Sequence, residues 1–229
     1  MTTIRKENIM KNILTTTIAL LALTVAANAT DLPSKTKAPA APAPVAAPAP
    51  AAPTDAITIG IQYDSDPVTN SNAKQQDTQA SINWVHQLGG GLAVGAKAAM
   101  ADTANGGNVF KGNAEADAYY TMPVFAGLNL KAAVGIGAKQ NSGSAAFDYY
   151  ALYTGADYKL NDSITLNAIN YRYRNAFDTI NNFESHQLAT GVTYNLDTYN
   201  AVQGVFQRTF DTSWNATQDT FALNYIRKF

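Results

Sequence analysis

The sequence predicts an all-β protein, a transmembrane antiparallel up-and-down β-barrel that is best described with ten strands. Residues 55–229 alternate apolar and polar side chains in ten stretches of strand length, and such alternation gives a strand one apolar and one polar face. The connections between the stretches alternate between short turns and longer polar loops, as in membrane barrels. The N-terminus has the features of a secretion signal.

The predicted strands follow one another closely along the chain. They cover 57–63, 78–88, 92–102, 113–122, 128–140, 147–160, 164–174, 186–196, 199–210 and 219–229. Tilted strands of about 10 residues are long enough to cross the hydrocarbon core of a bilayer. If two of the weaker stretches are loops, the barrel has eight strands.

Two of the stretches do not alternate cleanly. In 164–174, Leu166 and Ala168 lie on one face, whereas Ile169, Tyr171 and Tyr173 lie on the other. A β-bulge inserts one extra residue and would reconcile the two halves. The stretch 199–210 is ambiguous in the same way.

The connections predict the arrangement of the barrel. The gaps 89–91, 123–127, 161–163 and 197–198 are short, whereas 64–77, 103–112, 141–146, 175–185 and 211–218 are longer and polar. Short turns on one rim and long loops on the other place the turns in the periplasm. An even number of strands puts both chain ends on that side as well. A soluble β-sandwich is the alternative.

The costs of burying charge predict which side chains face the lumen. A Lys or Arg on the lipid face at the bilayer midplane costs about 2–4 kcal/mol, so charges opposite an apolar face should point inward. The predicted luminal charges are Lys97, Glu115, Asp117, Lys131, Asp157, Arg172 and Arg174. Antiparallel pairing predicts two ion pairs, Lys97 with Asp117 and Lys131 with Asp157. The two arginines are luminal if Tyr171 and Tyr173 belong to an outer aromatic girdle.

The N-terminal part of the chain divides into two segments. Residues 1–29 form a signal peptide, with a basic start, an apolar stretch, and Ala27 and Ala29 at the cleavage site. Met10 is an alternative start. Residues 30–54 form a periplasmic linker, because alternating Pro and Ala cannot pack a core and favour an extended chain.

Composition excludes several kinds of site. The chain has no Cys, 16 basic residues and 17 acidic residues, so disulfides, thiolate metal sites and a nucleic-acid partner are not expected. We expect no cofactor and no metal. We also expect no enzyme activity, although an outer-membrane hydrolase or acyltransferase using His186, close in sequence to Ser185 and Asp178, is the least favoured alternative.

The leader Thr30-Asp31-Leu32-Pro33, its Ala/Pro stretch and the final Phe229 resemble the small outer-membrane barrels of alphaproteobacteria, the opacity-like or porin-like surface antigens. The resemblance implies a protein of the outer membrane of a Gram-negative bacterium, in contact with outer-membrane lipid. It also implies that the barrel-assembly machinery recognises Phe229 with Tyr225 and Leu223. Arg227 departs from the aromatic residue usual at that position of the family.

Two functions remain open from the sequence. The first is a structural or porin-like role for a monomer or weak oligomer, with a narrow passive channel for small solutes, because barrels of about 8 strands are filled by side chains and those of 16–18 hold aqueous channels. The second is a tether to peptidoglycan, in which the family resemblance implies attachment at Thr30 or Asp31.

Overall fold

The computed structural model describes residues 52–65, 77–103, 111–140, 145–181 and 183–229. The predicted signal peptide and most of the linker lie outside these residues. Cleavage at Ala27 and Ala29 and attachment at Thr30 or Asp31 therefore stay predictions. No helix among the described residues has the length and hydropathy needed to cross a bilayer.

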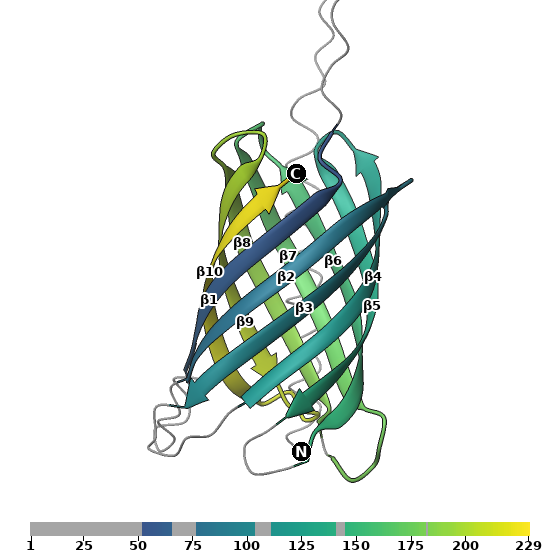
Figure 1. Ribbon diagram of the computed structural model, residues 1–229, viewed down its shortest axis with the longest axis vertical. Coiled ribbons are helices and arrows are strands. Elements are labelled where there is room, and N and C mark those ends of the chain that lie inside the picture. Colours follow the sequence, from purple (N-terminus) through teal and green to yellow (C-terminus); the bar gives the residue numbers. More distant parts are fainter. Residues whose placement is uncertain (1–51, 66–76, 104–110, 141–144, 182) are drawn as a thin grey trace, which may run out of the picture. The chain divides into compact units, whose positions relative to one another are not determined.

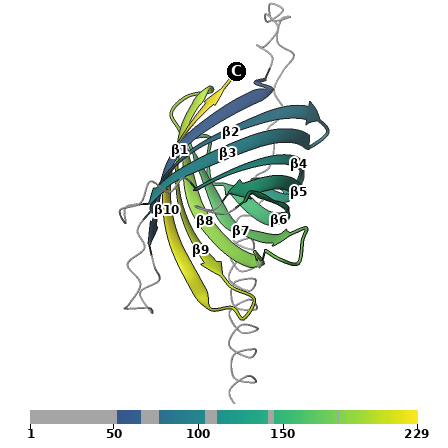
Figure 2. The same ribbon diagram turned by 60° about the horizontal axis from the view of Figure 1, so that its bottom comes forward.

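The described chain forms ten strands. They are β1 (Asp55–Ser65), β2 (Asp77–Gly89), β3 (Leu92–Thr103), β4 (Lys111–Phe125), β5 (Leu128–Gln140), β6 (Phe147–Lys159), β7 (Ile164–Ala176), β8 (Ser185–Asn195), β9 (Asn200–Phe210) and β10 (Ala216–Lys228). Each strand is antiparallel to its neighbours in the chain, and β1 pairs with β10 to close the barrel. Figures 1 and 2 show the tilted strands following one another around the barrel. The prediction of ten strands is confirmed, and the eight-stranded alternative is wrong.

The two ends of the barrel differ in their connections. The four short turns lie at the end where β1 begins and β10 stops (Figure 1), which we call the turn end. The longer connections lie at the opposite end, the loop end. Two predicted boundaries are wrong by three residues. The strand β10 begins at Ala216 rather than at 219, and β4 continues through Pro123 to Phe125, so that only Ala126 and Gly127 form the turn. A register shift between Pro123 and Phe125 accommodates the proline, which has no N–H to offer a ladder.

The tight turns are built from residues that suit them. Gly90, Gly91 and Gly127 have φ of 61°, 85° and 86°, a region that glycine enters at no steric cost. In the turn after β8, Asp197 accepts hydrogen bonds from the backbone N–H of Tyr199 and Asn200 at 2.7 and 2.8 Å. The hydrogen bond from the Asn200 side chain, together with these two, lowers the pKa of Asp197. The carboxylate therefore holds the turn to more acid pH than an ordinary Asp would.

The β-bulge predicted in 164–174 is present. Pairing of β7 with β8 shifts register between Asn167 and Asn170, and β6 shows the matching shift against β7. The extra residue turns Asn170, Arg172 and Arg174 inward after Asn167. By contrast, β9 pairs with β8 without any shift, so the ambiguity of 199–210 is not a bulge. Val205 faces the lumen there and the apolar Val202 and Phe206 face outward, so apolar side chains occupy both faces of a regular strand.

The barrel is apolar outside and polar inside. Large aliphatic side chains on the outer face are widely exposed, among them Ile61 at 64%, Val134 at 57% and Leu223 at 69%, whereas Glu115 and Asp117 are buried at 3% and 5%. An apolar surface of this extent is unfavourable in water and suits lipid. This distribution contradicts the soluble sandwich, whose apolar residues would face a shared core.

The seam between β1 and β10 is complete. The pair Asp55 and Phe229 exchange backbone hydrogen bonds of 3.0 and 2.9 Å at the turn end. At the other end the Thr220 hydroxyl donates to the Asp64 carboxylate across 2.5 Å, and Gln79 of β2 also donates to Asp64. Every strand edge in the described barrel is therefore paired, which removes the exposed edges that invite association with other chains.

Candidate functional site

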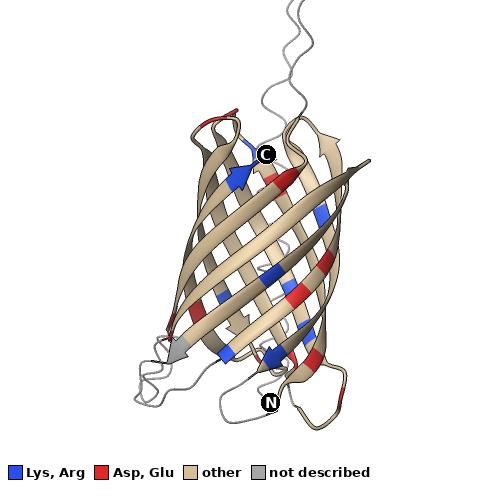
Figure 3. Ribbon diagram, viewed as in Figure 1, with Lys and Arg blue, Asp and Glu red and all other residues tan. Residues whose placement is uncertain are grey.

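The lumen has two unlike sides. One side, which we call the charged wall, is formed by β3 to β7. Its members are Lys97, Glu115, Asp117, Tyr119, Lys131, Tyr149, Tyr153, Asp157, Arg172 and Arg174. The other side, the amide wall, is formed by β8, β9, β10, β1 and β2. Its members are Gln62, Gln79, Ser81, Asn83, Gln187, Gln203, Gln207, Thr209, Gln218, Thr220 and Asn224. Figure 3 shows acidic and basic residues interspersed along the strands toward the loop end.

Glu115 is the centre of the charged wall. Its carboxylate lies 2.9 Å from Arg174 Nη2 and 2.7 Å from Lys97 Nζ. The Tyr149 hydroxyl donates to it across 2.7 Å, and the Tyr153 hydroxyl donates to its other oxygen. Because β5 and β6 separate β4 from β7 in the sheet, the contact with Arg174 reaches across the lumen. Charge-assisted hydrogen bonds are stronger than neutral ones. The cluster is therefore held firmly on this side of the barrel.

Lys97 and Lys131 form the two ion pairs that the strand pairing predicted. Lys97 Nζ lies 3.2 Å from Asp117, and Lys131 Nζ lies 2.6 Å from Asp157. Lys97 also contacts Glu115, its direct register partner on β4. The ammonium group of Lys97 therefore bridges two acidic neighbours.

Two glycines make room for tyrosines of the charged wall. A Cβ on Gly95 would lie 2.9 Å from the Tyr119 ring, and a Cβ on Gly137 would lie 2.7 Å from Tyr149. Each tyrosine thus lies flat across a strand that has no side chain to obstruct it. Tyr149 is fully buried in this position and donates to Glu115.

Substituting Gly137 tests this packing. An alanine there would place its Cβ 2.5 Å from the Ala114 carbonyl oxygen as well as against Tyr149, so Gly137→Ala should lower the free energy of unfolding by about 1–3 kcal/mol. Gly204→Ala is the matched control, because a Cβ on Gly204 meets nothing within 4 Å; its effect should stay within about 0.5 kcal/mol. Denaturant unfolding of the refolded barrel measures both. Equal effects of the two variants would contradict the argument.

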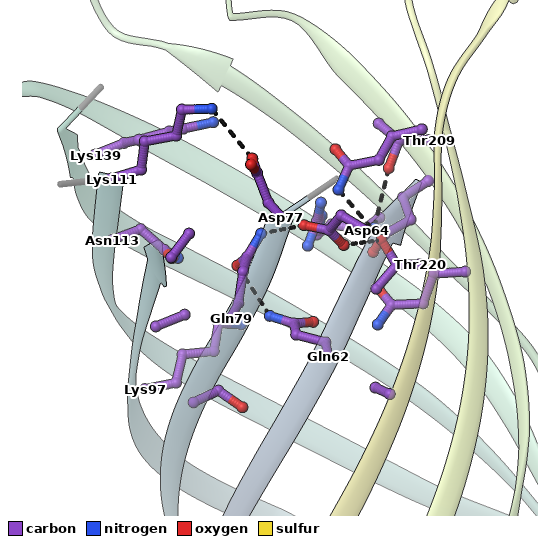
Figure 4. A pocket seen from close by; sticks show the side chains of 18 of the residues that line it. Gln62, Asp64, Asp77, Gln79, Lys97, Lys111, Asn113, Lys139, Thr209 and Thr220 are labelled. Atoms are coloured by element: carbon purple, nitrogen blue, oxygen red, sulfur yellow. Dashed lines mark hydrogen bonds and ion pairs between the residues drawn. The ribbon is translucent and has the colours of Figure 1, made fainter. Parts of the chain in front are cut away.

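A cavity of about 740 Å³ runs along the amide wall. It begins at the loop end, among Asp64, Asp77, Lys111 and Lys139, and reaches Asn83 and Asn224 deeper in the barrel. Figure 4 shows the loop-end portion, where Lys111 and Lys139 come from neighbouring strands and Asp64 is hydrogen-bonded to Thr220. The space is continuous on this side because amides and hydroxyls are shorter than the arginines and tyrosines opposite.

A network of amides joins the two walls toward the turn end of the lumen. Asn167, at the β7 bulge, donates to Asp157 at 3.0 Å and accepts from Thr193 and Gln203 at 3.1 and 3.0 Å. Gln203 in turn accepts from Asn224 across 2.9 Å. These bonds hold the side chains of Asn167 and Gln203 in the lumen.

The predicted site residues within the described chain fall into two groups. The seven predicted charges lie together on the charged wall, with Lys97, Arg172 and Arg174 also lining the cavity. Leu223, Tyr225 and Phe229 are exposed on the outer face, and their recognition by assembly machinery stays a prediction. Two partners of Glu115, Tyr149 and Tyr153, were not predicted from the sequence, and neither was the amide wall. Their inward alternation was visible in the sequence, but their depth in the lumen was not.

The histidines have structural neighbours. His186 Nδ1 lies 2.7 Å from the Tyr171 hydroxyl, and its ring stacks on Trp214 with centroids 4.5 Å apart. His86 Nδ1 lies 3.0 Å from Asp55 at the turn end. Among the described residues, the partners of His186 are thus aromatic groups rather than the Ser185 hydroxyl or Asp178. The same part of the chain contains no group of three or more His, Asp or Glu residues placed to hold a metal ion.

Neither a protein-family model nor a curated protein matches the sequence. Among solved structures, an outer membrane channel from Pseudomonas putida F1 is similar, with a TM-score of 0.51 and 11% identity over 82% of this chain and 100% of that one. The translocator domain of the autotransporter NalP from Neisseria meningitidis gives a TM-score of 0.45 and 9% identity, covering 77% of this chain and 88% of that one. The likeness to the first structure shows the fold, which is that of outer-membrane β-barrel proteins.

Proposed function

We propose that this protein is an integral outer-membrane barrel that forms a narrow, passive, water-filled path for small polar solutes. The observation that carries the proposal is the cavity of about 740 Å³ along the amide wall. A barrel whose only task is structural needs no such hollow, and the interior of a small barrel is usually filled by side chains. The channel from Pseudomonas putida F1, which has the same fold, supports the proposal.

The path should be narrow, because the charged wall occupies about half of the ring of strands. Hydrogen bonds hold the side chains of the Glu115 cluster and of the Asn167 network in place. These side chains therefore continue to occupy part of the lumen. In this arrangement the short turns and both ends of the barrel domain face the periplasm. The exposed Phe229, with Tyr225 and Leu223, is the signal we propose for the assembly machinery.

Single-channel conductance in planar bilayers tests the proposal. The refolded mature chain, residues 30–229, should give reproducible small current steps. Ala222→Trp should reduce them, because Ala222 lines the cavity. Phe221→Trp is the matched control, since the adjacent Phe221 faces outward and is 57% exposed. A barrel that is shown to be folded by heat-modifiable mobility but gives no steps would overturn the proposal.

A further inference from the structure

We propose that the loop end of the cavity is a binding site for small anions that carry carboxylate or phosphate groups, centred on Arg172 and Lys139. This inference names the class of solute for the proposed channel and so rests on that function. It depends on the balance of charge around the cavity. The lining includes the cations Lys97, Lys111, Lys139, Arg172 and Arg174, against two acidic residues, Asp64 and Asp77.

Three of these cations already have an acidic partner. Lys97 contacts Glu115 and Asp117. Arg174 contacts Glu115, and Lys111 lies 3.2 Å from Asp77. The remaining acidic group of the lining, Asp64, accepts hydrogen bonds from the neutral Thr220 and Gln79.

Arg172 and Lys139 have no ion pair within the described part of the chain. The Arg172 Nε atom is buried without a hydrogen-bond partner, although the side chain lines the cavity. Lys139 Nζ lies 4.2 Å above the ring of Phe183, which also lines the cavity. Lys139 is near enough to Arg172, Arg174 and Lys111 to be repelled by all three, against attraction from the single carboxylate of Asp64. A cation that is removed from water without a counter-charge is unfavourable, and an anion between these groups would relieve that cost.

The surroundings favour an oxygen anion over a simple halide. A guanidinium group presents a planar set of N–H donors that matches carboxylate and phosphate oxygens, and a lysine adds a point charge. A neutral donor lies next to Arg172 as well: its register partner on β8 is Gln187, whose Nε2 now donates to Thr209 across 3.2 Å. Glu115, whose negative charge acts on Arg172 from the charged wall, is already paired with Lys97 and Arg174.

Calorimetric titration of the refolded chain, residues 30–229, with inorganic phosphate and with citrate tests the site at equilibrium, whether or not the barrel conducts. We expect saturable binding that weakens at least about tenfold in the double variant Lys139→Gln, Arg172→Gln. Lys159→Gln, which removes a half-exposed charge at the turn end, is the control for net charge and should bind as the parent does. Arg172→Lys should bind phosphate with intermediate affinity. It keeps the positive charge but loses the planar set of N–H donors of the guanidinium group.

The same proteins in bilayers separate this inference from the proposed function. Under a KCl gradient the parent should be anion-selective, and the double variant should shift its reversal potential toward cation selectivity. Binding without conductance would overturn the channel and leave the anion site. Conductance with equal phosphate affinity in the parent and the double variant would overturn the anion site and leave the channel. Absence of both would overturn both proposals.

Discussion

Glu115→Gln should lower the free energy of unfolding of the barrel by about 3–5 kcal/mol, the usual cost of removing one partner from a buried ion pair. Glu115 is only 3% exposed and accepts from Arg174, Lys97, Tyr149 and Tyr153. Glutamine keeps the shape and one acceptor oxygen. It removes the charge, however, so Arg174 would lose its acidic partner and Lys97 would keep only Asp117.

Denaturant unfolding of the refolded barrel measures this loss. Asp157→Asn is the control, because the Lys131–Asp157 pair has side chains 35% and 17% exposed and should lose clearly less. Adding Arg174→Met to Glu115→Gln should recover part of the loss, since it removes the cation that has lost its acidic partner. If Glu115→Gln unfolded at the same denaturant concentration as the parent, Glu115 would not be the centre of the charged wall.

Val134→Arg should lower the free energy of unfolding in a lipid bilayer by about 2–4 kcal/mol. Val134 lies midway along β5, points outward and is 57% exposed. An arginine there would place a charge in hydrocarbon, where neither water nor a counter-charge reaches it. Smaller losses are expected for the same change nearer the ends of the strand, because the cost falls toward the interfaces.

The matched control for Val134→Arg is Ser81→Arg. Ser81 lies near the middle of β2 and lines the cavity, so its arginine would extend into a polar lumen. Unfolding in lipid vesicles should separate the two variants clearly. Equal losses would contradict the assignment of the outer face to lipid.

Sequence alone predicted the features that depend on neighbouring residues and strands. Alternation found all ten strands, and the change of face between Ala168 and Ile169 found the bulge in β7. The ion pairs of Lys97 and Lys131 followed from the pairing of adjacent strands. Each of these features needs only the period of a strand and the register of one hairpin.

Contacts across the lumen could not be predicted in this way. The distance between Glu115 and Arg174 depends on the tilt and closure of the whole barrel, which combine the registers of all ten strands. For the same reason, the gathering of charged residues on one side and amides on the other could not be predicted. The end of β4 was also misplaced, because Pro123 suggests a turn although a bulge keeps it in the strand.

The seam between β1 and β10 also has a consequence for the kinetics of folding. Every other pairing joins strands that follow one another in the chain. Each of these nine hairpins therefore closes a much shorter loop than the pairing of β1 with β10. The seam instead joins residues as far apart as Ala56 and Lys228, and the entropy lost in closing a loop grows with its length. Pairing of β1 with β10 should therefore be the last and rate-limiting contact to form. A circular permutant that joins the two ends and opens another turn would move this slow step to a new pair of strands.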